Sequence, residues 1–405
     1  MTHLKVHIIS GIGPDSSGTG QFLSHLLASQ ENGGKMTVRF HYPLRPAGNR
    51  KDMIRRGRLM EAGFDWLRVG ASRLWLSAKL RWLATMDDGI WILLHPQTLG
   101  FKRSLRYLRA KSGRVLYFGL DESFFCVRSY NHCSGESGAC LRCLGGHFEA
   151  AAQQECRPFP IDDDAAFEFV REFFALLRQG RVGVLAQNER NAELYRRHGG
   201  HKSQVEVVGL WTDDLTRLFE DFPQRASQPY SEGYDIVFHG YYVAAKGADW
   251  LLEVARRLPQ ARFLYPTSLP RHVVGAPLNV TFKPMTWDTG LAAEVAKAKI
   301  VCAPSLWSAP IEGALVKSIV VGRATARVGV GSAFGDELPE GLVLNLDPDP
   351  VNAARQLGDA LEADWAPEAG LHKAWTETFR KENIDVLGRI LRAAERLAEK
   401  PRPAG

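Results

Sequence analysis

Two stretches in the second half of the chain place a charged side chain after a short apolar run. In the first, Phe238 is followed by His239 and Gly240, and Lys246 stands just before Gly247. A glycine directly after a strand lets a ligand approach the backbone, and a lysine that opens the next helix adds charge to the positive end of its dipole. The pattern predicts a phosphate-binding turn. An ordinary strand-loop-helix connection with a surface lysine would show the same residues.

The second stretch, residues 301–318, carries one carboxylate, Glu312, and one lysine, Lys317. Pro304 and Pro310 kink the loop between the end of a strand and the start of a helix. A carboxylate near a helix start can accept hydroxyl groups from a sugar or a ribose, although acidic residues favour first turns for dipole reasons alone. Lys317 could reach a phosphate or stand in solvent.

The first half offers three further candidates. A glycine-rich loop, residues 11–20, follows the first apolar run, but no Lys-Ser/Thr pair comes after its last glycine, so it is not a Walker loop. His95 ends an apolar strand and could orient an acceptor hydroxyl or the donor, and a capped surface histidine is the alternative. Asp121 and Glu122 end another strand, where either could act as a base or simply cap a helix.

Five of the six cysteines lie between Cys126 and Cys156. In a reducing compartment such a cluster is more often a metal site than a disulfide framework. The polar, glycine-rich residues between the cysteines cannot bury a core unaided, so a metal would stabilise the loop. The spacing predicts a closed structural zinc site with Cys133, Cys140, Cys143 and Cys156 as ligands. A disulfide pair or free thiols are the alternatives.

Residues 51–82 are strongly basic. They carry eight Lys or Arg residues against three acidic ones, a local charge of +5 in a chain whose net charge is +6. Trp66, Trp75 and Trp82 are interleaved with the cations. A basic, tryptophan-bearing amphipathic segment is typical of a helix at a membrane surface. A crossover helix with one core stripe and a solvated basic face is the alternative.

Alternating strands and helices must position these residues. A length of 405 residues suggests two domains, and the alternation implies parallel sheets with helices on both faces. We therefore expect an α/β protein with two doubly wound, Rossmann-like domains that face a central cleft. The expected units are an acceptor-side domain at 1–228 with a Cys-rich insertion at 126–160, a donor domain at 229–405, and a final helix at 370–399 that packs back on the first domain.

The motif order in the second half resembles the donor half of glycosyltransferase family 4. Gly240 and Lys246-Gly247 come first, then Pro-Ser-Leu-Trp at 304–307, then Glu312. This resemblance implies a GT-B fold and a retaining, metal-independent transferase. By position, Lys246 matches the family's phosphate-binding lysine. The chain departs from the family pattern at three positions, because Tyr241 replaces an arginine and Ala309 and Lys317 replace two glutamates.

The resemblance implies a hexosyltransferase that moves a sugar, with retention, from a nucleotide-sugar donor to a glycan or lipid-linked acceptor in bacterial surface polysaccharide synthesis. A membrane-surface helix at 51–82 would make that acceptor lipid-linked, for example on undecaprenyl diphosphate. We expect Lys246, Glu312 and His95 to carry catalysis, with no catalytic metal. The departures leave open a catalytically inactive GT-B scaffold or binding protein, and an inverting GT-B transferase. The expected donor-binding residues are Gly18, Thr19, Gly20, Gly240, Tyr241, Lys246, Ser305, Ile311, Glu312, Gly313, Ala314 and Lys317.

Composition narrows the partners and the location. A net charge of +6 and a pI of about 9.0 suit phosphates, nucleotides or an anionic membrane face. None of the usual nucleic-acid motifs is present, so we expect no nucleic-acid partner. The apolar run Val6–Ile9 is too short for a signal sequence, and no stretch reaches about 18 apolar residues. We expect a cytoplasmic protein that is peripheral on the inner face of the cell membrane.

Overall fold

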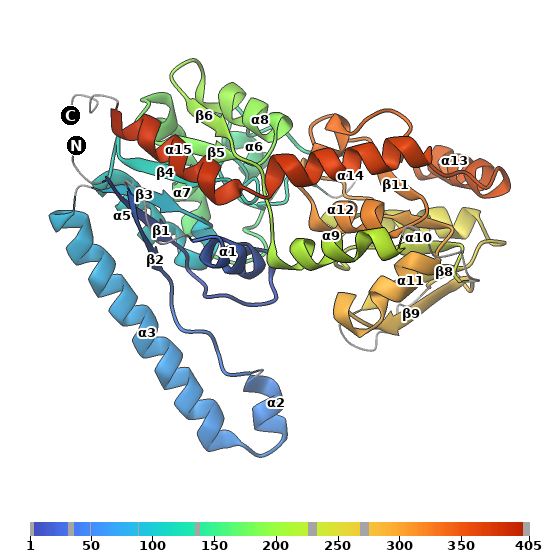
Figure 1. Ribbon diagram of the computed structural model, residues 1–405, viewed down its shortest axis with the longest axis horizontal. Coiled ribbons are helices and arrows are strands. Elements are labelled where there is room, and N and C mark those ends of the chain that lie inside the picture. The colour runs from blue at the N-terminus through green and yellow to red at the C-terminus, as the bar shows by residue number, and fades with distance from the viewer. Residues whose placement is uncertain are drawn as a thin grey trace.

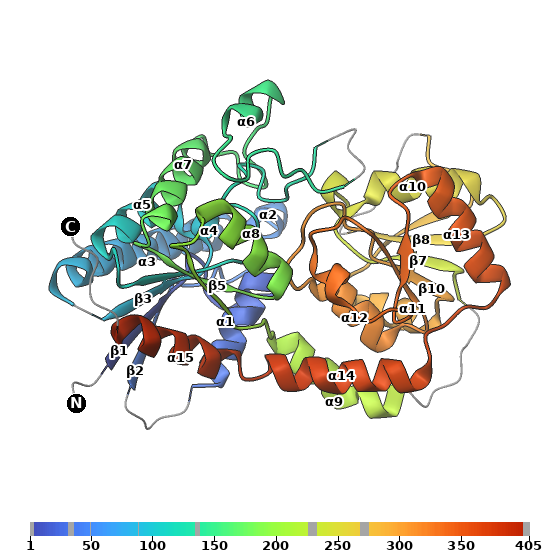
Figure 2. The same cartoon turned by 90° about the horizontal axis from the view of Figure 1, so that it is seen from above.

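The structure is a computed structural model in which two parallel sheets, each flanked by helices, lie side by side along the long axis (Figures 1 and 2). The predicted domain boundary at 228–229 lies outside the described residues. The described residues are 4–30, 36–48, 50–87, 89–133, 138–225, 233–267 and 275–399. We call residues up to 225 the first half and those from 233 the second half.

The first half contains a six-stranded parallel sheet in the order β2-β1-β3-β4-β5-β6. Its inner strands are short runs of buried residues, as expected for strands covered by helices on both faces. The strands are β1 (Leu4–Ile9), β2 (Met36–His41), β3 (Ile90–Leu93), β4 (Val115–Phe118), β5 (Gly183–Ala186) and β6 (Gln204–Val207).

The second half contains a six-stranded parallel sheet in the order β12-β11-β10-β7-β8-β9. The central pair is β7 and β10, whose last residues, Phe238 and Cys302, stand opposite one another. Their carboxyl ends therefore open onto the same edge of the sheet, where ligands bind in such folds. The strands are β7 (Ile236–Phe238), β8 (Phe263–Thr267), β9 (Val280–Pro284), β10 (Ile300–Cys302), β11 (Thr325–Val328) and β12 (Leu344–Leu346).

Helices connect the strands in both halves, so the predicted α/β architecture is confirmed. Those of the first half are α1 (Gly18–Ala28), α2 (Arg50–Arg55), α3 (Leu59–Met86), α4 (Pro96–Leu99), α5 (Phe101–Ala110), α6 (Glu149–Gln153), α7 (Ala165–Arg178), α8 (Glu189–Gly199) and α9 (Asp213–Arg225). Those of the second half are η1 (Ala244–Lys246), α10 (Ala248–Arg257), η2 (Trp287–Thr289), α11 (Leu291–Lys297), α12 (Gly313–Val321), η3 (Phe334–Glu337), α13 (Pro350–Glu362), α14 (Ala369–Asn383) and α15 (Val386–Glu399).

The end of the chain returns to the first half as two helices, where the sequence predicted one. The helical stretch is interrupted between Asn383 and Val386. α14 runs beside α9, and α15 then contacts β1, β3 and β5 of the first sheet (Figure 2). Trp375 and Phe379 of α14 are buried and stack on one another. The side chain of Asn383 accepts the Leu210 N–H at 3.1 Å, which ties the break to the first half.

The basic segment predicted at 51–82 forms α2 and the long helix α3. Figure 1 shows α3 running along the outside of the first half and diverging from it toward α2. Among the described helices, none combines the length and the apolar character that a bilayer span requires.

Candidate functional site

Lys246 and Glu312 form a buried ion pair at the shared edge of β7 and β10. The Lys246 Nζ lies 2.6 Å from the Glu312 Oε1, and the two side chains are 11% and 7% exposed. The Ser305 hydroxyl donates to the same carboxylate oxygen at 2.7 Å. The loops after two adjacent strands therefore bring together a cation and an anion that are 66 positions apart in the sequence. The predicted residues Lys246, Glu312 and Ser305 thus share one site.

A glycine fixes the approach of these two loops. Gly247 has a φ of +71°, and a Cβ built on it would lie 2.1 Å from the Pro304 carbonyl oxygen. The Leu306 N–H donates to the Ala245 carbonyl at 2.9 Å, which pins the loops together beside that glycine. Only a residue without a side chain allows both the backbone angle and the close approach.

The start of α12 points its unpaired amides at the same site. Glu312 is the N-cap residue, and its side chain makes no capping bond because it is engaged with Lys246. The first-turn N–H groups, including those of Gly313 and Ala314, have no partner within a helix. An anion at this position would meet the amides, the helix dipole and Lys246 together.

Aromatic rings from both halves cover the lysine. The Lys246 Nζ lies 4.8 Å from the centre of the Trp307 ring and 5.5 Å from that of Tyr130. The two rings are 4.5 Å apart. Burial, followed by the charges of Asp121 and other nearby groups including Glu312, raises the pKa of Tyr130. The site therefore lies between the two halves. Tyr130 was not among the predicted site residues, because nothing in the sequence pattern around it marks it as functional.

Lys317 and Tyr241 lie outside the Lys246–Glu312 pair. The Lys317 Nζ forms an ion pair with Asp214 of α9, so this lysine joins the two halves. The Tyr241 side chain, at the family's arginine position, is 74% exposed. Between the two lysines lies His239, whose ring stacks on Trp287 with centres 5.0 Å apart. Burial, helped by the charges of Lys317 and Lys246, lowers the pKa of His239 to about 3.

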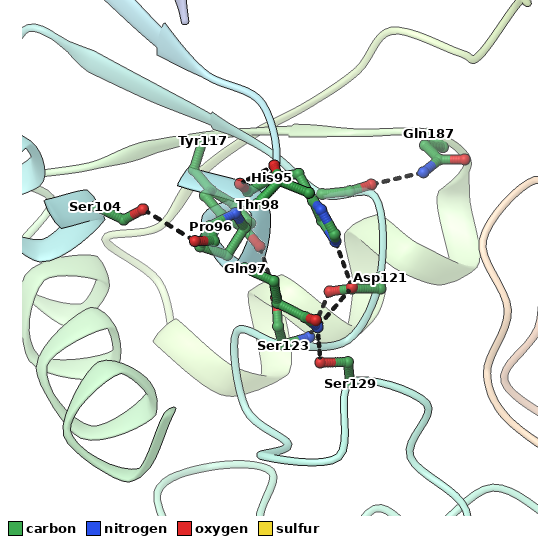
Figure 3. A network of polar contacts seen from close by, with 11 residues as sticks. His95, Pro96, Gln97, Thr98, Ser104, Tyr117, Asp121, Ser123, Ser129 and Gln187 are labelled. Carbon is green, nitrogen blue, oxygen red and sulfur yellow. Dashed lines mark hydrogen bonds and ion pairs between the residues drawn. The ribbon is translucent and has the colours of Figure 1, made fainter. Parts of the chain in front are cut away.

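His95 is held by a carboxylate in the first half. Its Nε2 lies 2.8 Å from the Asp121 Oδ2, as Figure 3 shows. Gln97 donates to the same oxygen at 3.2 Å and also bonds Ser129, while the other Asp121 oxygen accepts the Ser123 N–H at 2.9 Å. The ring is thus fixed, and its Nδ1 has no hydrogen-bond partner among the described residues.

Glu122 is unsuited to act as a base. Its side chain is fully buried and accepts the Asn191 amide at 3.3 Å. Burial, with the neighbouring charge of Asp121, raises its pKa well above the usual range. Burial therefore disfavours the ionised form of this carboxyl group. Of the two carboxylates suggested for an inverting reaction, only Asp121 stays a candidate, and it is engaged with His95.

The predicted residues Gly18, Thr19 and Gly20 form the first turn of α1. The Ser17 hydroxyl caps that helix by accepting the Gly20 N–H, and the Asp15 carboxylate accepts the Ser17 N–H at 2.8 Å. Figure 2 shows α1 and α12 on the facing sides of the two halves. The joint role of this turn and the Lys246–Glu312 pair in donor binding stays a prediction.

The Cys-rich segment, residues 126–160, contacts the site through Asn131 as well as through Tyr130. The Asn131 Oδ1 accepts the backbone N–H of Ser308 at 3.1 Å and its hydroxyl at 2.8 Å. The Cys156 thiol has Cys133 as a hydrogen-bond partner, and all six cysteines are free of disulfides. Within the described ranges, no three His, Cys, Asp or Glu side chains are arranged to hold a metal ion. The zinc site stays a prediction.

Comparisons with known proteins rest on structure alone. No family model and no curated protein matches the sequence. The chain is similar to a sucrose-phosphate synthase from Thermosynechococcus elongatus, with a TM-score of 0.60, 16% identity, and coverage of 98% of this chain and 99% of that one. It is similar to an alpha,alpha-trehalose-phosphate synthase (UDP-forming) from Burkholderia vietnamiensis, with a TM-score of 0.55 and 11% identity. That alignment covers 99% of this chain and 100% of the other. It is also similar to HepE from Anabaena in complex with UDP and glucose, with a TM-score of 0.55 and 12% identity. That alignment covers 98% of this chain and 100% of the other.

These similarities extend over nearly the whole chain, at 11–16% sequence identity. They show the architecture rather than the activity. The two parallel α/β units of this chain align with the neighbours over 98–99% of its length. The chain therefore has the GT-B fold.

Proposed function

We propose that this protein is a retaining glycosyltransferase that moves a sugar from a nucleotide-sugar donor to a hydroxyl group of a glycan or lipid-linked acceptor. The observation that carries the proposal is the buried Lys246–Glu312 pair at the start of α12. It stands at the carboxyl ends of two adjacent strands, in a fold shared with an Anabaena protein that holds UDP and glucose. We therefore place the donor diphosphate beside this pair.

The chemistry follows from charge. When the glycosidic bond to the donor breaks, negative charge develops on the departing diphosphate, and fixed positive groups lower the barrier by stabilising it. Lys246 and the first-turn amides of α12 are positioned for that role. Glu312 accepts from both Lys246 and Ser305 through one oxygen, so its second oxygen can accept a sugar hydroxyl. No step requires a metal.

The state of the first-half carboxyl groups favours retention. An inverting transferase needs an ionised base at the acceptor hydroxyl. Glu122 is fully buried with a raised pKa, and Asp121 is engaged with His95 and Gln97. We assign His95 to orientation of the acceptor, with Asp121 fixing its ring. The anomeric configuration of the product, read by NMR, tests this part, and an inverted product would assign Asp121 as the base instead.

A thermal-shift panel of UDP, GDP, dTDP and ADP with their common sugars tests donor binding, because a ligand that binds only the folded state raises its melting temperature. We expect one nucleotide to raise the melting temperature of the wild type. The same nucleotide should leave the melting temperature of Lys246→Ala unchanged. Lys297→Ala, which removes an exposed lysine of α11, is the matched control and keeps the shift. No shift with any nucleotide would favour a scaffold that kept the fold and lost donor binding.

A further inference from the structure

The long helix α3 has two apolar faces, which is one more than a helix on the surface of a domain needs. One face is buried against the first half and includes Ala62, Val69, Leu76, Leu80 and Leu83. The last three belong to the core that also contains β3 and β4. This face accounts for the position of α3 on the protein.

The opposite face is apolar and exposed. Residues at 60, 64, 67, 71, 74, 75, 78 and 82 follow helical spacing and include no charged side chain. Its six large members are 60–90% exposed, with Trp82 at the lower end and Met60 at the upper end. At a rise of 1.5 Å per residue the stripe is roughly 33 Å long. The six are Met60, Phe64, Leu67, Leu74, Trp75 and Trp82.

Such a stripe is not explained by folding. Scattered exposed apolar residues are normal, but a continuous exposed stripe marks a surface that meets a partner or a membrane. The predicted alternative, a core stripe backed by a solvated basic face, is wrong in one respect, since the face opposite the core is apolar. The cations stand on the flanks of the helix instead.

The flanking charges indicate what covers the stripe. Arg68, Lys79 and Arg81 border it, and the Lys79 Nζ lies 4.9 Å from the centre of the exposed Trp75 ring. Acidic residues do not offset this charge. Residues 51–82 contain only three of them, and two, Glu61 and Asp65, already pair with arginines of the same segment.

A second copy of the chain does not fit this surface. Two α3 helices in contact would bring a local charge of +5 against another +5, with no acidic row to offset the repulsion. An anionic lipid leaflet satisfies both features at once. Its headgroups attract the flanking cations, and tryptophan prefers the boundary between headgroups and acyl chains.

We infer that α3 is a membrane-docking helix that lies in the plane of an anionic bilayer, with the stripe from Met60 to Trp82 inserted and the flanking cations among the lipid phosphates. The buried face stays on the protein, so no unfolding is needed for docking. The first half, which carries His95, would face the membrane side (Figure 1). The inference rests on α3 alone and stands whether or not the protein transfers a sugar.

Flotation of the full chain with vesicles tests the inference. We expect binding to vesicles of phosphatidylcholine mixed with phosphatidylglycerol, binding weaker by about tenfold or more to phosphatidylcholine alone, and a decrease with added salt. The variant Leu67→Gln/Trp75→Gln/Trp82→Gln, which keeps helix-forming residues, should lower partitioning by about tenfold or more. Lys79→Gln/Arg81→Gln, which removes two flanking cations, should lower only the part of the binding that depends on phosphatidylglycerol.

The matched control is Ile161→Gln/Leu278→Gln/Val351→Gln, which removes three exposed apolar side chains outside α3 and should bind like the wild type. Melting temperatures of all variants show that they are folded. Wild-type binding by the α3 triple variant would overturn the inference, as would no binding of the wild type to either vesicle. A wild-type dimer that the α3 triple variant converts to a monomer would place a second copy on this face instead.

Discussion

In the proposed site, Lys246 supplies the positive charge that stabilises the departing diphosphate. It is buried against two aromatic rings and a carboxylate that also holds Ser305. A lysine that served only stability would be an unusual choice here, because a buried ion pair adds little net stability over apolar residues of similar volume.

Replacing this lysine should remove catalysis. We expect Lys246→Ala to lower turnover by about 100-fold or more, because one preorganised positive group at a developing negative charge contributes on that scale. Lys246→Arg keeps the charge and should retain more activity than Lys246→Ala. Steady-state turnover with the nucleotide sugar found in the thermal-shift panel measures both. Turnover of Lys246→Ala equal to that of the Lys297→Ala control would contradict the mechanism.

Three buried histidines make stability depend on pH. Burial lowers the pKa of His41, His198 and His239 to about 3, from an ordinary value of 6.5. The folded state keeps them neutral while the unfolded state takes up protons below 6.5, so stability is complete above that pH and falls as the pH drops toward 3. Glu122 acts in the opposite sense, because its raised pKa costs stability as the pH rises above its ordinary value.

We expect each of these histidines to remove about 1.4 kcal/mol of unfolding free energy per pH unit in that window. Urea unfolding at pH 7.5 and pH 5.5 measures the sum. His198→Gln, which removes one titrating group, should make the dependence on pH less steep. The same dependence on pH for His198→Gln and the wild type would show that His198 is not kept neutral in the folded state.

At the scale of elements, the site depends on how closely two loops approach. Gly247→Ala should destabilise the fold by about 1–3 kcal/mol, because alanine is strained at a φ of +71° and its Cβ would meet Pro304. The nucleotide shift should be lost with it. Gly70→Ala in α3 is the control, since nothing lies within 4 Å of the added Cβ and alanine favours a helix. The urea concentrations at the unfolding midpoint compare Gly247→Ala with Gly70→Ala. Equal stability of the two variants would show that the site does not need glycine at position 247.

The Cys-rich segment offers a second test at this scale. If it holds structural zinc, metal analysis of the purified protein should find about one zinc per chain. Cys140→Ser/Cys143→Ser should lose the metal and lower the melting temperature, because metal binding stabilises such a loop. Cys302→Ala, in β10 of the second half, should keep the metal. A zinc-free wild type would leave the cysteines as free thiols.

At the scale of the whole molecule, the last helix belongs to the core of the first half. Val386, Leu387 and Ile390 of α15 are buried in the same cluster as Val6 and Ile92. The second half of the sequence therefore completes the packing of the first sheet. The ion pair between Lys317 and Asp214 and the hydrogen bond that the Ser308 hydroxyl donates to Asn131 join the halves elsewhere.

A core substitution in α15 should therefore weaken the first half. We expect Ile390→Ala to cost about 2–5 kcal/mol of unfolding free energy through the cavity it leaves. The exposed Arg392→Ala should change stability by about 0.5 kcal/mol or less. Hydrogen exchange should show faster exchange in β1, β3 and β5 for Ile390→Ala. Exchange that accelerates only in the second half would show that α15 is not part of the first core.

Local patterns in the sequence determined much of this protein. Short apolar runs alternating with helical stripes predicted two parallel α/β units, because strand and helix periodicities depend on neighbouring residues. The glycine and lysine after one strand and the glutamate before one helix pointed to Lys246 and Glu312 for the same reason. The excess of cations and tryptophans at 51–82 likewise marked α3.

Only the tertiary structure decided which of these residues meet. It paired Lys246 with Glu312, brought Tyr130 of the other half over them, and engaged Lys317 with Asp214 instead. It also decided that the outward face of α3 is apolar, because the sequence shows which residues share a face and not which face the core covers. Contacts between distant segments depend on packing, and no local pattern records that packing.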